Sequence, residues 1–224
     1  MVVALAVGAA ARATPPGGPS FDVEGLVQVR TVVDGVITEQ YGGRIPGRPA
    51  WVWQESWDQC RHPRPVEVTE LRFIPAAAVD ALLAKTPGPD RAAIERLPTT
   101  TCEVAGTTDR FFTWAVFQTP PLVPTMWSLV ENTRSAVPSG EGPAEMTIVA
   151  RQVAGSMGGV LTTTSIAWPA DGPARTVWRT STEIRPGFPV PDVLLGQIIP
   201  QAKAPPRRLL FEGLRARAAR EAAP

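Results

Sequence analysis

The second half of the chain is a succession of strand-like segments joined by short turns, and this pattern limits the fold more than any other feature. The segments alternate apolar and polar residues and are rich in Thr and Val, as half-buried strands are. They cover residues 99–105, 110–119, 128–136, 144–152, 160–168 and 175–184. Turn-forming stretches such as SGEGP and PADGP separate them, and no helical pattern alternates with them. The sequence therefore predicts an antiparallel meander, not a parallel βαβ sheet.

The first hundred residues add a hairpin and several short helices. Asp34-Gly35 stands between two alternating runs, which is a strong hairpin signal. Pro49 suits the first turn of a helix, on which Trp53 and Trp57 share one face because they are four residues apart. The expected elements are strands at 26–33, 36–45 and 66–73, a helix from Pro49, and helices at 76–85 and 89–97.

The C-terminal forty residues carry an apolar stripe at helical spacing. Leu194 and Ile198 belong to this stripe, and arginines occupy the opposite side of the same stretch. Pro200 is expected to kink the helix, and Pro205-Pro206 to end it or to start a second piece. The two pieces, about 30 residues in all, would reach roughly 40 Å, which is enough to cross a sheet.

This order of elements resembles the START-like, or SRPBCC, superfamily of helix-grip folds, which includes polyketide cyclase/dehydrase-like and lipid-transfer members. The stretch RPAWVWQESWDQCRHP resembles the superfamily's first helix, and TWAVFQTPPLVPTMWSLVENT resembles its central strand pair. Residues 158–215 resemble its last hairpin, proline-containing loop and C-terminal helix. The resemblance implies an α+β fold with a curved antiparallel β-sheet wrapped around a long C-terminal helix, and with short helices inserted after the first strands.

In such a fold an apolar cavity lies between the sheet and the helix. The residues expected to line it are Phe112, Trp114, Val116, Met146, Ile148, Trp178, Leu194 and Ile198. The alternative is that these side chains fill a solid core, because a cavity wall and a core face have the same sequence pattern. The predicted function is the binding, and by extension the transport, of a lipid or other hydrophobic small molecule by one domain over residues 21–221. We expect a monomer, with peripheral membrane contact as an option.

Groups that carry common catalytic chemistry are scarce. The chain has one histidine, His62, so it offers no obvious base for a hydrolytic triad and too few ligands for a zinc site. The net charge of +1 and the lack of a basic stripe with interleaved aromatics argue against nucleic-acid binding. We therefore predict no catalytic residue, no metal and no cofactor.

Two other functions stay open. A cyclase/dehydrase-like enzyme would place polar side chains in the same pocket, and the candidates are Glu131, Arg151, Glu183 and Arg185. A buried carboxylate with a raised pKa would favour this function. A non-catalytic envelope interaction module would instead have a filled core, with the C-terminal helix against a partner.

Residues 1–20 are interpreted as the remnant of an export signal followed by a linker. An apolar run over 2–11, too short to span a bilayer, precedes the small-x-small triplet Ala11-Arg12-Ala13, but no basic residue precedes that run. The alternative is a disordered alanine-rich tail on a cytoplasmic protein. A periplasmic or secreted protein would be expected to pair Cys60 with Cys102, whereas two separate thiols are as plausible in the cytoplasm.

Overall fold

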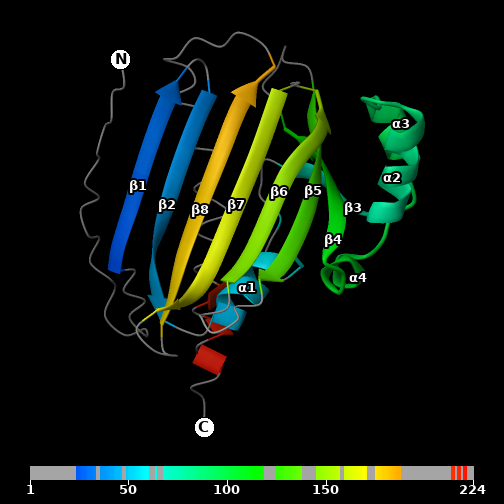
Figure 1. The fold of residues 1–224 in the computed structure, drawn as a ribbon. Helices are drawn as coiled ribbons and strands as arrows, with labels where there is room; N and C mark the ends of the chain where they lie inside the picture. The colour runs from blue at the N-terminus through cyan, green and yellow to red at the C-terminus, as the bar shows by residue number, and fades with distance from the viewer. Residues whose placement is uncertain are drawn as a thin grey trace.

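An eight-stranded antiparallel sheet, flanked by short helices, forms the fold (Figure 1). The structure, a computed structural model, describes residues 24–33, 36–46, 49–60, 64, 68–118, 125–137, 145–156, 159–170, 175–187, 213, 214, 216, 217, 219 and 220. The architecture is α+β, of the helix-grip type that the sequence predicted. The expected signal and linker at 1–20, His62, Leu194 and Ile198 lie outside the described residues, and what was expected of them stays a prediction.

The elements follow one another as in the predicted order. The strands are β1 Glu24–Val33, β2 Val36–Pro46, β3 Val68–Pro75, β4 Arg110–Phe117, β5 Met126–Val137, β6 Glu145–Gly155, β7 Gly159–Ala170 and β8 Arg175–Pro186. The helices are α1 Pro49–Trp57, α2 Ala76–Lys85, α3 Arg91–Glu95 and α4 Cys102–Gly106. Helical residues are also present at the C-terminus, at 213, 214, 216, 217, 219 and 220.

The strand order in the sheet is β1-β2-β8-β7-β6-β5-β4-β3. Val33 pairs with Val36, so the predicted hairpin around Asp34-Gly35 is confirmed. The pairing of Ile37 with Ile184 joins this hairpin to the end of the meander, and β3 forms the other edge of the sheet. The meander from β4 to β8 is antiparallel throughout, as the turn-rich sequence predicted.

The strand predicted over 99–105 is wrong, because the chain forms α4 there. Thr100 makes a single β-bridge with Phe73, after which Thr101 caps a short helix. The Thr101 hydroxyl accepts a hydrogen bond from the Val104 amide at 3.3 Å. A run of three threonines has a high strand propensity, but threonine is also a good N-cap, and here the cap prevails.

The two faces of the sheet meet different helices. We call the face beneath α2 and α3 the outer face and the face that packs against α1 the inner face. On the outer face Val79 of α2 and Ile94 of α3 pack into one buried cluster with strand residues of β3, β4 and β5. The strand members of this outer cluster are Ile74, Phe112, Trp114, Val116 and Leu129. Burial of these large side chains holds the two helices on the sheet.

Candidate functional site

One row of side chains crosses the inner face from β5 to β8. Arg134, Ile148, Ser165 and Thr180 lie in register, each directly opposite the next on the neighbouring strand. Residues directly opposite one another in antiparallel strands share a face of the sheet. The helix α1 packs against β6, β7 and β8, and the contacts of Arg134 with α1 identify this face as the inner one.

Three of the residues expected in the ligand site lie together on the inner face. Met146 and Trp178 both lie opposite Ala167 of β7, in the row next to that of Ile148. Met146 is 6% exposed and Trp178 is 4% exposed. Ile148 packs against the smaller buried cluster of Trp57, Ala105 and Phe111. The structure thus brings Met146, Ile148 and Trp178 onto one apolar surface near α1.

Buried hydroxyl groups lie beside these apolar side chains. The hydroxyls of Ser165 and Thr180 are 2.8 Å apart, and those of Thr163 and Thr182 are 3.0 Å apart. Thr180 and Thr182 are buried. These residues were not predicted to belong to the site, because threonine in a strand is expected from its β propensity alone. The two-residue spacing of Thr163 and Ser165, and of Thr180 and Thr182, is the signal that each pair shares a face of its strand.

Two indole rings of α1 hold the guanidinium of Arg134. The Cζ atom of Arg134 lies 5.3 Å from the ring centroid of Trp53 and 5.0 Å from that of Trp57. Asp109 accepts a hydrogen bond from Arg134 Nε at 2.8 Å and orients the cation. The Trp57 ring also meets Phe111 edge-on, with centroids 4.9 Å apart. The predicted sharing of one helix face by the two tryptophans is consistent with these contacts.

The indole N–H groups of Trp53 and Trp57 are buried, yet no acceptor among the described residues lies within hydrogen-bonding distance of either. Buried polar groups in proteins are nearly always hydrogen-bonded, so two such donors one helical turn apart are unusual. The sequence shows the spacing of the two tryptophans. It does not show that their N–H groups have no hydrogen-bond acceptor among the described residues.

The C-terminal helical residues lie on the same side of the sheet as α1 (Figure 1). Arg217 is 3.7 Å from the buried carboxylate of Glu55, and its guanidinium lies 5.3 Å from the centroid of Trp51. Leu214 is fully buried. The end of the chain therefore contacts α1, as a helix that covers the inner face would require.

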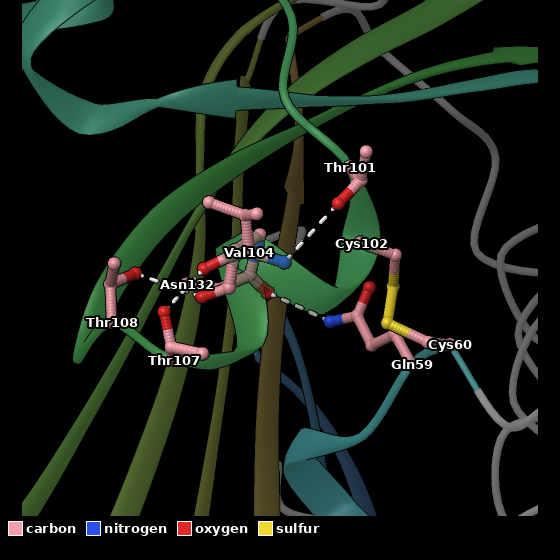
Figure 2. Close-up of a disulfide and its surroundings, with 9 residues drawn as sticks. Gln59, Cys60, Thr101, Cys102, Val104, Thr107, Thr108 and Asn132 are labelled. Atoms are coloured by element: carbon pink, nitrogen blue, oxygen red, sulfur yellow. Dashed lines mark hydrogen bonds between the residues drawn. A yellow bond between two sulfur atoms is a disulfide. The ribbon is translucent and has the colours of Figure 1, made fainter.

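A disulfide fixes the C-terminal end of α1 (Figure 2). Cys60, three residues after α1, is bonded to Cys102, the first residue of α4. Next to it, Gln59 Nε2 donates a hydrogen bond to Oδ1 of Asn132 on β5 at 3.4 Å. The disulfide and this hydrogen bond tie the end of α1 to the inner face. This cysteine pair is the one expected of an exported protein.

Phe112, Trp114 and Val116 are not on the inner face, and the expectation of a single wall that includes them is corrected. Their partners on β5 are Glu131, Leu129 and Trp127, which point to the same side as the outer cluster. The three side chains pack beneath α2 and α3, and the sheet separates them from Met146, Ile148 and Trp178. The physical reason is the pairing register of the strands. Side chains alternate between the two faces, so a shift of one residue in the pairing moves all the apolar side chains of a strand to the other face.

The candidate enzyme residues do not gather at the inner face. Glu131 accepts hydrogen bonds from Arg110 Nε at 2.7 Å and from Arg151 Nη2 at 2.7 Å on the outer face. Arg110 also binds Asp80 of α2 through two hydrogen bonds of 2.6 and 2.8 Å. Glu183 is exposed and pairs loosely with Arg185 at 3.6 Å. The pair of Arg110 and Asp80 joins α2 to the sheet.

The ionisation of Glu131 also speaks against a role as a general acid. Burial raises the pKa of this carboxyl, but the hydrogen bonds from Arg110 and Arg151 outweigh that effect, and the net pKa lies below its ordinary value. Glu131 is therefore an anion near neutral pH. The raised pKa that would have favoured an enzyme is not observed at this buried carboxyl.

Within the described part of the chain, no three His, Cys, Asp or Glu residues gather in a way that could hold a metal ion. Among the same residues, no helix is both long enough and apolar enough to cross a membrane.

Comparisons with known proteins show the fold but give no match in sequence. Neither a protein-family model nor a curated protein matches this chain. The crystal structure of human STARD10 is similar over 87% of this chain and 71% of that chain, with a TM-score of 0.50 and 11% identity. The human StarD13 (DLC2) lipid transfer and protein localization domain matches over 88% and 86%, with a TM-score of 0.46 and 12% identity. Human StAR-related lipid transfer protein 5 matches over 87% and 88%, with a TM-score of 0.41 and 11% identity.

Proposed function

Since the chain has a START-like fold, we propose that it binds a lipid or another hydrophobic small molecule between the inner face of the sheet and α1. The observation that carries the proposal is the composition of the inner face. Met146, Ile148 and Trp178 supply buried apolar contacts there, and hydroxyl groups lie beside them. A largely apolar surface with a few placed polar groups is typical of sites for hydrophobic ligands.

The contrast with the outer face supports this choice of side. Beneath α2 and α3 the buried side chains are large and apolar and belong to one packed cluster, so that face is already covered by the protein itself. The inner face is covered by α1, which Arg217 near the C-terminus contacts in turn. We propose that Leu194 and Ile198 complete the cover on this side, as their helical spacing predicts.

A cyclase/dehydrase-like activity has no comparable support. Of its four candidate residues, Arg151, Glu183 and Arg185 are exposed, and Glu131 is ion-paired on the outer face. An envelope interaction module would need the inner face to be solidly filled. The hydrogen-bonded hydroxyls make that face unlike an ordinary apolar core.

The proposal is tested by extraction and by titration. Purified protein is extracted with organic solvent for mass spectrometry, and delipidated protein is titrated with a fluorescent fatty acid. We expect an extractable hydrophobic molecule and saturable binding. Replacement Trp178→Ala should lower the affinity while the protein stays folded, whereas Trp114→Phe in the outer cluster should leave the affinity unchanged. A protein that carries no such molecule and does not bind the probe would disprove the proposal.

The disulfide suits export to an oxidising compartment, and we propose a periplasmic or secreted location. Fractionation of the natural host with an antibody to the protein tests this, and recovery in the cytoplasm with free thiols would contradict it. A monomeric state and contact with a membrane surface stay predictions. Size-exclusion chromatography and vesicle sedimentation would measure them.

A further inference from the structure

Three groups that can donate hydrogen bonds meet around Arg134 on the inner face. Trp53 and Trp57 contribute two buried N–H groups that have no acceptor among the described residues, and the guanidinium of Arg134 lies over both rings. Asp109 is the carboxylate that pairs with this cation, and its side chain is largely exposed, at 79%. Glu55 of α1 is near Arg217 instead. We call Trp53, Trp57 and Arg134 the donor cluster.

We infer that the donor cluster holds the polar end of the ligand, and that this end is a hydrogen-bond-accepting oxygen such as a carboxylate or ester carbonyl. The inference rests on the proposed function and names the chemistry of the molecule bound there. The apolar part of the ligand would extend along Met146, Ile148 and Trp178. These residues occupy rows of the inner face at and beside the row of Arg134.

The unpartnered indoles carry the argument. A buried N–H without an acceptor destabilises the folded protein, and a phenylalanine would give much of the same packing without that cost. Trp57 is 2% exposed, so bulk water does not reach its N–H in the described structure. A ligand oxygen at this place would give the indole N–H groups an acceptor.

The positive charge of Arg134 favours a negatively charged group at the polar end of the ligand. Its guanidinium is held on two sides by ring faces and by Asp109, and its side chain is only 15% exposed. A cation at the end of a ligand would be repelled here, whereas a carboxylate would be attracted in this low-dielectric environment. A neutral ester keeps the hydrogen-bond acceptor but lacks the charge, so it separates the indole contribution from the arginine contribution.

Trp114 offers a matched control on the other face of the sheet. Its N–H is also buried without an acceptor, but the ring lies within the outer cluster, with Arg72 4.9 Å and Arg91 5.9 Å from its centroid. If an unpartnered indole were simply tolerated in this fold, Trp57→Phe and Trp114→Phe would behave alike. If the donor cluster binds the ligand, only the change at Trp57 should weaken binding of the acid and the ester.

The test uses full-length, delipidated protein and three molecules with the same chain, namely dodecanoic acid, methyl dodecanoate and dodecylamine, measured by isothermal titration calorimetry. We expect the acid to bind best, the ester next, and the amine at least about tenfold more weakly than the acid. Trp57→Phe should weaken the acid and the ester about tenfold each, and Trp114→Phe should weaken neither. Arg134→Gln should weaken the acid while it spares the ester.

Each result decides one of the two ideas. Equal binding of all three molecules, or a Trp57→Phe protein that binds the acid and the ester as tightly as the natural protein, would overturn the inference while the proposed function stands. If the protein binds none of the three molecules and does not bind the fluorescent fatty acid, both ideas fail. If Trp57→Phe does not fold, as judged by its urea transition, Trp53→Phe provides the same readout from the other indole. Unchanged affinity of Trp53→Phe for the acid and the ester would then overturn the inference.

Discussion

The two faces of the sheet bury different kinds of side chain. The outer face buries Phe112, Trp114 and their neighbours against α2 and α3, and it keeps its charges at the margin in a chain of ion pairs. The inner face buries hydroxyls and an amide beneath α1, a helix that is fixed by a disulfide. Because stability is served best by the first kind of face, the second kind calls for a functional explanation.

The largest expected effect tests whether the outer face is a packed core. Phe112→Ala should lower the free energy of unfolding by about 3–5 kcal/mol, because the ring is fully buried and the rigid cluster around it would leave a cavity. Urea unfolding followed by fluorescence measures it. Val104→Ala is the control, since that side chain is 55% exposed and its loss should change little. A loss below about 1 kcal/mol in Phe112→Ala would mean that the outer face is loosely packed.

Removal of the disulfide, which fixes α1 on the inner face, should give the next largest loss of stability. The double variant Cys60→Ser with Cys102→Ser should be about 2–4 kcal/mol less stable, because the bond limits the freedom of the unfolded chain. Reduction of the natural protein with dithiothreitol should give the same loss, and either single variant should match the double. Equal stability of the oxidised and reduced proteins would show that α1 does not depend on this link.

Alternation within each strand predicted the strands but not the assignment of their faces. Phe112, Trp114 and Val116 share a face, as expected, and so do Met146 and Ile148. Nothing in the sequence of a single strand says which of its two faces joins which face of a distant strand. That relation depends on the register and on bulges such as the one between Leu129 and Val130, which only the assembled sheet defines.

The helix at Cys102–Gly106 and the donor cluster could not be predicted from the sequence either, for different reasons. At α4 two local tendencies of threonine compete, and Cys102, the residue after the Thr101 cap, is linked by a disulfide to Cys60, which local propensity does not include. At the donor cluster the spacing of Trp53 and Trp57 was visible. The approach of Arg134 from a strand more than seventy residues later was not.

A smaller effect is expected at the ion pairs of the outer face. Glu131→Gln should cost about 1–2 kcal/mol at neutral pH, since its partners Arg110 and Arg151 are partly exposed and can be solvated. Because the folded pKa of Glu131 lies below its unfolded value, its contribution is fully present above the unfolded pKa and is lost as the pH falls through the folded pKa.

Urea unfolding between about pH 7 and pH 3 measures this linkage, since the ordinary pKa of a glutamate is about 4.3. The natural protein should lose stability faster than Glu131→Gln as the pH falls over the acidic part of this range. Glu183→Gln is the matched control, because Glu183 lies on the same face but is exposed. Parallel pH profiles for the natural protein and Glu131→Gln would contradict the ionised network.

The smallest effect distinguishes the inner hydroxyls from the outer ion pairs. Thr163→Val should cost about 1 kcal/mol, because it leaves the buried hydroxyl of Thr182 without its partner, whereas the double change with Thr182→Val should recover most of that loss. A double-mutant cycle in urea measures the coupling.

Binding of dodecanoic acid to the double variant tells whether the hydroxyls also contact the ligand. If they serve only stability, the double variant should bind the acid as the natural protein does. If they contact the ligand, the affinity should fall although stability is restored. A double variant less stable than either single would mean that both hydroxyls have other essential partners, and the inner face would then be a polar core in its own right.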